Sequence, residues 1–161
     1  MLDIDFLDSS DCESIMQTLI LEAKKSIPTD IPVACAIYKY ENSKLELISK
    51  VHNTRELHKD PTHHAEILAI KEASQILGDW RLDNCILLST LEPCIMCSAT
   101  LTQSRIGAVV FGAYDEQYGA CGSIYNFLSD PRLNHNAKVI GGVLEEQCSV
   151  MLKDFFNQLR K

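Results

Sequence analysis

The sequence lacks any long run of apolar residues, although hydrophobic residues make up 46% of its 161 positions. No stretch approaches the ~20 apolar residues that a membrane-spanning helix needs. The acidic start, from Met1 to Asp5, lacks the basic segment of a secretory signal. Internal repeats, low-complexity segments and linkers are also missing. These absences predict a single domain over residues 1–161, located in the cytoplasm and not bound to a membrane.

The sequence also lacks a regular, even set of cysteines. Its seven cysteines are scattered, and only Cys94 and Cys97 lie close together. An odd, scattered set argues against a disulfide framework. In a reducing compartment such cysteines are buried, bound to metal or catalytic.

The sequence also has no excess of basic over acidic residues. The net charge of −7 is unlike that of general nucleic-acid binders, which are usually basic. The excess of acids lies mostly upstream, because residues 99–161 contain six acids and six bases. A local basic surface in the last third is therefore compatible with the composition.

Hydrophobic periodicity predicts helices that alternate with short strands. Helices are expected over residues 10–25, 63–77, 93–103 and 144–159, with a short one near 124–128. Strands are expected over 31–40, 45–51, 84–89, 106–111 and 137–140, with a hairpin turn at 41–44. The capping candidates are Ser9, Ser10 and Asp11, then Asp60 or Thr62, then Gly78, and Pro93 as a first helical residue. This order predicts an α/β fold, a three-layer α/β/α sandwich around a central mixed five-stranded sheet.

Two short segments carry residues suited to metal chemistry, His64-Ala65-Glu66 and Pro93-Cys94-Ile95-Met96-Cys97. Cys94 and Cys97 are three residues apart in the first turn of a predicted helix, so their sulfurs point the same way. His64 lies near the start of another helix, and helix starts carry partial positive charge that favours the thiolate form of cysteine. One histidine and two cysteines leave the fourth position of a tetrahedral zinc ion open for water, which is typical of catalytic sites.

Glu66 completes this predicted site. Zinc lowers the pKa of a bound water toward about 7, and a glutamate outside the ligand set can move that water's proton to a substrate ring nitrogen. A CxxC pair or an HxE pair alone says little, since each also arises by chance or in structural sites. Their joint occurrence is the signature of zinc deaminases. His63 is the competing ligand, but only His64 has a glutamate two residues later.

At these residues the chain resembles the cytidine and deoxycytidylate deaminase superfamily, and more closely the family of bacterial tRNA adenosine deaminases. The resemblance covers most of the chain. It includes Asn53, residues 60–67, 90–97, 104–107 and 110–113, Asp115, Gly119, residues 122–123 and 134–135, and Asp154-Phe155-Phe156.

This resemblance implies a cytidine deaminase-like fold with one zinc ion per subunit, held by His64, Cys94 and Cys97, and proton transfer by Glu66. It implies hydrolytic deamination of the wobble adenosine of a tRNA anticodon to inosine. It also implies a homodimer that binds the anticodon stem-loop. The substrate contacts that it implies come from Asn53, Asp115, Asn134 and Phe155.

Some positions depart from the usual family pattern. Ala34-Cys35 replaces a usual Gly-Ala, Ser98-Ala99 replaces another, and His63 stands where alanine is usual. If RNA is the substrate, six basic residues are candidates for phosphate contacts: Arg105, Arg132, Lys138, Lys153, Arg160 and Lys161.

Two alternative functions stay open. One is deamination of a free base, nucleoside or nucleotide, of the guanine or deoxycytidylate type. The other is a non-catalytic zinc-binding module. Residues 110–123 and the closing Phe155-Phe156 helix favour RNA, because an enzyme for free bases needs no extended RNA surface. Glu66 argues against a structural module, which has no use for an unliganded carboxylate.

Overall fold

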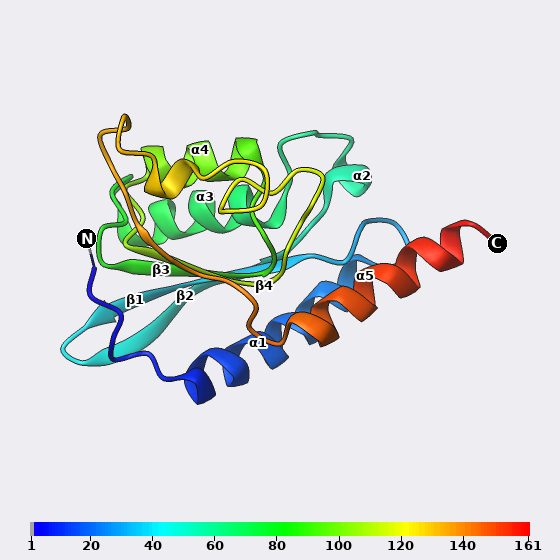
Figure 1. The fold of residues 1–161 in the computed structure, drawn as a ribbon, viewed down its shortest axis with the longest axis horizontal. Helices are drawn as coiled ribbons and strands as arrows, with labels where there is room; N and C mark the ends of the chain where they lie inside the picture. The colour runs from blue at the N-terminus through cyan, green and yellow to red at the C-terminus, as the bar shows by residue number, and fades with distance from the viewer. Residues whose placement is uncertain (1) are drawn as a thin grey trace.

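The computed structural model describes residues 2–161, which form a five-stranded sheet covered by helices on both faces (Figure 1). The strand order is β2–β1–β3–β4–β5, where β1 runs antiparallel to β2 and β3, and β3, β4 and β5 are parallel. The strands are β1 (Ala34–Glu41), β2 (Lys44–His52), β3 (Cys85–Leu91), β4 (Ala108–Ala113) and β5 (Lys138–Ile140). The helices are α1 (Ser9–Ala23), α2 (Arg55–His58), α3 (Ala65–Leu77), α4 (Ile95–Gln103) and α5 (Glu145–Leu159), with 3-10 turns η1 (Lys24–Ser26) and η2 (Phe127–Ser129). The expected three-layer sandwich with a mixed five-stranded sheet is confirmed.

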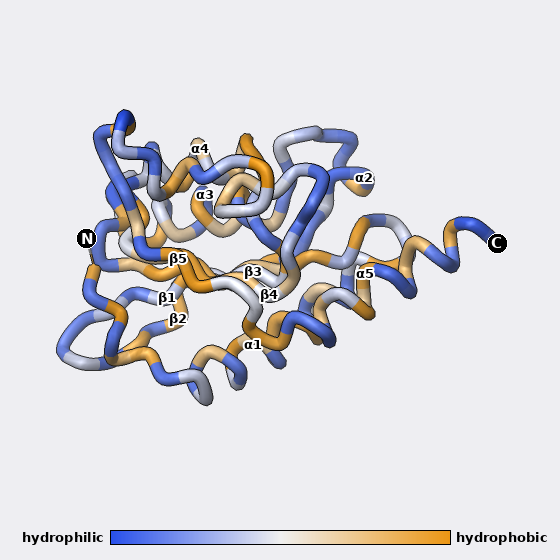
Figure 2. The backbone as a smooth tube through the Cα atoms, in the orientation of Figure 1, coloured by the Kyte–Doolittle hydropathy of each residue, from blue (hydrophilic) through white to orange (hydrophobic). Residues whose placement is uncertain are grey.

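The central strands are buried on both faces, because alternate side chains enter two separate cores. On β3, Cys85 and Leu87 pack into the core under α3 and α4, whereas Ile86 and Leu88 pack into the core with α1 and α5. Figure 2 shows the apolar residues gathered along the sheet and the helix faces that cover it. This alternation explains why the strands read as continuous apolar runs.

Two turns agree with the sequence pattern. Asn42 and Ser43 have φ of 53° and 60° in the predicted hairpin turn, where Glu41 pairs with Lys44. Gly78 ends α3 in the left-handed conformation, with φ of 69°.

The helix starts differ from the expected ones. The cap of α1 is Asp8, the last extended residue, whose side chain accepts a hydrogen bond from the Asp11 backbone N–H. The predicted caps of α3 are also wrong, because Asp60 accepts hydrogen bonds from Thr62 in its own turn, well before the helix. Helix α3 therefore begins at Ala65, two residues after the start that the sequence pattern predicts.

Other differences concern short elements. Helix α2 was not expected; it forms because the buried Asp30 carboxylate accepts hydrogen bonds from the backbone N–H groups of Glu56 and Leu57. The helix expected near 124–128 is the 3-10 turn η2 at Phe127–Ser129. Within residues 2–161, no helix has the length and apolar character needed to cross a membrane.

The sheet topology brings the candidate site together. Because β3 and β4 are parallel, their carboxyl ends lie at one edge of the sheet, where ligand sites in α/β folds usually form. Helix α4 follows β3 directly at that edge, and the loop 114–126 follows β4 there. Helix α3 packs against β1 and α4, so its start reaches the same edge (Figure 1).

Candidate active site

The three predicted metal ligands meet at the starts of two helices. His64 is the N-cap of α3 and Cys94 is the N-cap of α4, while Cys97 lies in the first turn of α4. Helix α4 begins at Ile95, so Pro93 precedes the helix instead of opening it. Neither N-cap side chain bonds the helix backbone. Both are therefore free to face each other.

The distances between these ligand atoms suit one zinc ion. The Nδ1 atom of His64 lies 3.6 Å from the Sγ atoms of both Cys94 and Cys97. A tetrahedral zinc ion, with bonds of roughly 2.0–2.1 Å to nitrogen and 2.3 Å to sulfur, separates such ligands by about 3.6 Å. Among residues 2–161, these three side chains form the only cluster of potential metal ligands whose atoms lie within 4.8 Å of one another. His63 stays outside it, with Nε2 3.3 Å from Asp60.

The thiols are poised for metal binding. The pKa of Cys94 is lowered to about 4, first by a hydrogen bond from Cys97 and then by one from His64. The same hydrogen bond, together with burial, raises the pKa of Cys97. The metal-binding form of cysteine is the thiolate, so binding of a cation would release the proton that Cys97 retains.

Glu66 lies buried beside this cluster. Its side chain is only 4% exposed, and Oε2 lies 3.5 Å from Sγ of Cys97 while Oε1 lies 3.5 Å from the hydroxyl of Ser89. Burial raises the pKa of the Glu66 carboxyl above its usual value. The carboxylate is thus a stronger base than an exposed glutamate, and it lies outside the ligand set.

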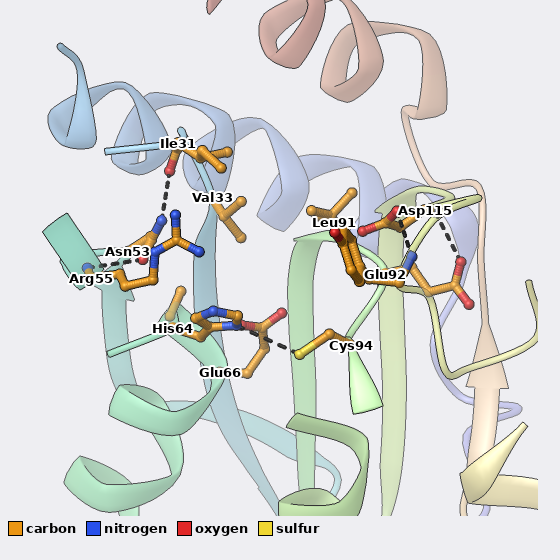
Figure 3. A pocket seen from close by; sticks show the side chains of 12 residues that line it. Ile31, Val33, Asn53, Arg55, His64, Glu66, Leu91, Glu92, Cys94 and Asp115 are labelled. Atoms are coloured by element: carbon orange, nitrogen blue, oxygen red, sulfur yellow. Dashed lines mark hydrogen bonds between the residues drawn. The ribbon is translucent and has the colours of Figure 1, made fainter. Parts of the chain in front are cut away.

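The cluster opens into a pocket of about 380 Å³. This volume is in the range of small-molecule sites. Figure 3 shows His64, Glu66 and Cys94 on one side, with Asn53 and Arg55 next to them and Glu92 and Asp115 across the pocket. Apolar contacts come from Ile31, Val33 and Leu91. An apolar wall with a few polar groups around it suits a heterocyclic base.

Two of the four expected substrate contacts line this pocket, Asn53 and Asp115. The Asn53 amide donates to the Ile31 carbonyl at 3.1 Å and accepts from the Arg55 backbone N–H at 3.2 Å. Asp115 Oδ1 accepts from the backbone N–H groups of Gln117 and Tyr118. Both side chains are therefore held in place by their neighbours.

The other two expected contacts, Asn134 and Phe155, lie elsewhere. Asn134 is exposed in the loop between η2 and β5. Its neighbour His135 lies 2.7 Å from the carbonyl of Ile106, which precedes β4, so this loop is at the opposite edge of the sheet (Figure 1). Phe155 is 6% exposed and lines a groove between α5 and α1. The structure brings neither residue to the pocket.

The pocket also contains three polar or aromatic side chains that were not predicted from the sequence, those of Arg55, Glu92 and Tyr118. Arg55 lies two residues after Asn53 and begins α2, an element that was not expected. Glu92 is an acid at the end of an apolar strand, directly before Pro93-Cys94. A charge at such a place indicates a specific role, because a buried carboxylate is costly unless hydrogen-bond donors surround it.

Comparison with known proteins agrees with this geometry. Residues 9–113 match the family described as the cytidine and deoxycytidylate deaminase zinc-binding region. The tRNA-specific adenosine deaminase of Bacillus subtilis (strain 168) is 43% identical over 150 residues, which cover 92% of this chain and 91% of the relative. That of Aquifex aeolicus (strain VF5) is 45% identical over 149 residues, which cover 92% of this chain and 95% of the relative.

A solved structure is also similar. It comes from studies of A-to-I editing by tRNA:A34 deaminases at the wobble position of transfer RNA, and it matches with a TM-score of 0.78 and 30% sequence identity. The match covers 86% of this chain and 98% of that chain. The expected cytidine deaminase-like fold is thereby confirmed. The chain belongs to the zinc-binding cytidine and deoxycytidylate deaminase family, whose members are zinc-dependent hydrolytic deaminases.

Proposed function

We propose that this protein deaminates the wobble adenosine of a tRNA anticodon to inosine. The observation that carries the reaction is the buried Glu66 carboxylate, which lies beside the His64, Cys94 and Cys97 cluster at a pocket suited to a base. The substrate is supported by relatives of 43% and 45% identity, named tRNA-specific adenosine deaminase, that match over nearly their whole length.

The residues of the pocket suit a hydrolytic deamination. When bound by His64, Cys94 and Cys97, zinc supplies an acidified water at neutral pH. Glu66 accepts a proton at its carboxylate and returns it to a ring nitrogen of the base. In the net reaction a C–O bond replaces the C–N bond at C6 of adenine, water is consumed and ammonia leaves. The enclosed carboxylate keeps this proton from bulk solvent.

Asn53 is suited to hold the flipped base. An amide offers two N–H donors and two acceptor lone pairs, and Asn53 uses one of each on Ile31 and Arg55. One donor and one acceptor remain, which complement the N7 acceptor and N6 donor of adenine. We propose that Asp115 contacts the same nucleotide from across the pocket.

The rest of the tRNA would lie outside the pocket. We propose that Phe155 and Asn134 act on parts of the RNA away from the target base, because both lie outside the pocket. We also propose a homodimer in the cytoplasm, with both subunits contacting one tRNA. Exposed apolar side chains at the start of α4 and directly after Ser123, those of Ile95, Ile124 and Tyr125, support burial in such an assembly.

The test is a comparison of substrates. We expect conversion of adenosine to inosine, detected by mass spectrometry, in an anticodon stem-loop with adenosine at the wobble position. A matched stem-loop with guanosine there serves as the control. Little ammonia should come from free adenosine, guanine or deoxycytidylate. Fast turnover of a free base or nucleotide with an unchanged stem-loop would overturn the substrate and favour a small-molecule deaminase.

A further inference from the structure

A second buried carboxylate, that of Glu92, lies at the pocket wall opposite Glu66 (Figure 3). It is only 1% exposed. Its Oε1 accepts hydrogen bonds from the backbone N–H groups of Cys121 and Ser123, both at 3.0 Å. Its Oε2 accepts from the backbone N–H of Asp115 at 3.0 Å and from the Ser123 hydroxyl. One side chain thus binds both ends of the loop from Asp115 to Ser123.

These contacts distinguish Glu92 from a proton carrier. A carboxylate has about four acceptor positions, and all four of Glu92 are occupied by donors from the loop. Three of these donors are backbone N–H groups, which cannot reverse the direction of the hydrogen bond. Glu92 is therefore saturated as an acceptor and is left without a free position for water or substrate.

The loop is also shaped to receive this carboxylate. A Cβ atom at Gly119 would lie 2.5 Å from Oε2 of Glu92 and would also overlap the carbonyl of Asp115. Further contacts tie the loop to the start of α4, because the Ala120 N–H donates to the Pro93 carbonyl at 2.9 Å. Residue 119 must therefore be glycine for the loop to approach Glu92 this closely.

The loop carries pocket-lining side chains. Asp115 and Tyr118 both line the pocket, and Tyr118 is 65% exposed. The carboxylate of Asp115 accepts from the Tyr118 backbone N–H, which ties the two residues to each other. An exposed aromatic ring beside a base pocket is suited to stack on a neighbouring nucleotide.

We propose that Glu92 is a positioning residue for the RNA substrate: its carboxylate holds the loop 115–123 so that Asp115 and Tyr118 receive the target nucleotide and its neighbour. This inference rests on the proposed function for the identity of the substrate. The anchoring of the loop itself does not depend on that function.

The decisive variant is Glu92→Gln, which keeps the size of the side chain but replaces one acceptor oxygen by an NH₂ donor. That NH₂ must face at least one backbone N–H of the loop. Hydrogen–deuterium exchange should show at least about tenfold faster exchange at Asp115, Cys121 or Ser123, since a hydrogen bond to a charged group is lost. Glu116→Gln makes the same chemical change on an exposed residue of the same loop and should leave exchange unchanged.

Kinetics on the stem-loop separate positioning from general damage. We expect Glu92→Gln to raise KM by about tenfold, to lower kcat by less than about threefold and to keep one zinc per chain, because the side chains of Glu66 and the metal ligands take no part in the hydrogen bonds between Glu92 and the loop. Unchanged loop exchange, or an unchanged KM in a folded, zinc-loaded variant, would overturn the proposal.

Gly119→Ala is the second variant, in case Glu92→Gln does not fold. Its added Cβ pushes the loop away from an intact Glu92, so it should give the same rise in exchange and KM with zinc retained. Normal values in Gly119→Ala would contradict the proposal. If the unmodified enzyme does not deaminate the stem-loop, the proposed function fails, whereas the exchange measurement still decides whether Glu92 anchors the loop.

Discussion

The Sγ atom of Cys97 lies 3.5 Å from Oε2 of Glu66, although the two residues belong to different helices. This contact joins the candidate metal centre to Glu66, the candidate proton-transfer residue. Its geometry depends on the packing of α3 against α4, and neither helix could supply the site alone.

Replacement of Glu66 should separate metal binding from catalysis. We expect Glu66→Ala to keep one zinc per chain and to lose about 10²–10⁴-fold in kcat, because the proton carrier is missing while the ligands remain. Metal analysis and ammonia release from the stem-loop measure the two properties. Glu72→Ala removes an exposed acid from the same helix and should behave like the parent enzyme. Full turnover without Glu66 would refute the mechanism.

Replacement of a ligand should have the opposite result. Cys94→Ala leaves only two protein ligands, so we expect loss of zinc and of activity together. The control is Cys12→Ala, because Cys12 is buried on α1 and lies outside the ligand cluster. Zinc content after dialysis against a mild chelator checks both variants. Stoichiometric, tightly held zinc in Cys94→Ala would show that the ligand set is assigned wrongly.

The end of α5 should contribute to RNA binding. Lys153 on α5, and Arg160 and Lys161 directly after it, are exposed, and this helix extends past the sheet on the side of α2 (Figure 1). Replacing all three by alanine should weaken stem-loop binding and flatten its salt dependence by about 0.7 in log–log slope per lost phosphate contact. The slope is measured from binding of the stem-loop at several salt concentrations. Both the parent and the triple variant carry Glu66→Ala in this measurement, so that the bound RNA is not converted.

Lys138 provides the matched comparison for that measurement. It is already paired with Asp3 and Asp5, at 3.5 and 3.2 Å. Lys138→Ala should therefore change the slope less than a single alanine replacement of Lys153, Arg160 or Lys161. A triple variant with the parent slope would place the RNA on another surface.

Glu22 should make stability depend on pH. Although burial opposes it, hydrogen bonds from Lys25 and His52 hold the pKa of the Glu22 carboxyl below its usual 4.5. A lowered pKa in the folded state stabilises the protein above the unfolded pKa, and this contribution is lost as the pH falls through the folded value.

Glu22→Gln should therefore cost about 1 kcal/mol in the free energy of unfolding at pH 7. The difference from the parent should shrink below pH 4.5 and vanish once the pH is below the lower, folded pKa. Urea unfolding at pH 7, 5 and 3 measures the difference, with the exposed Glu13→Gln as a control. A difference that grows on acidification would contradict the assignment.

Much of this architecture was predictable because local patterns carry it. The apolar runs that form β3 and β4 and the alternating hairpin of β1 and β2 were expected within a few residues of their observed bounds. The His64, Glu66, Cys94 and Cys97 set was also visible, since its spacing is local within each helix start. The proximity of the two segments then follows from parallel strands that end at one edge.

Contacts between distant segments were not predictable in this way. Glu92 is separated from Ser123 by 31 positions, and no local pattern reports that its carboxylate meets the loop. Helix α2 depends on Asp30 in the same manner. Asn134 was tied to the substrate by resemblance alone, and it lies at the far edge of the sheet, because the loop that carries it returns to the start of β4.

The two ligand-bearing helices begin without a side-chain cap, because His64 and Cys94 occupy the N-cap positions. Serine or aspartate there would typically stabilise a helix by ~1 kcal/mol. Selection for thermal robustness alone would therefore favour replacing these residues, and each replacement would remove a ligand. The site persists as a compromise in which catalytic competence opposes the stability optimum of the scaffold.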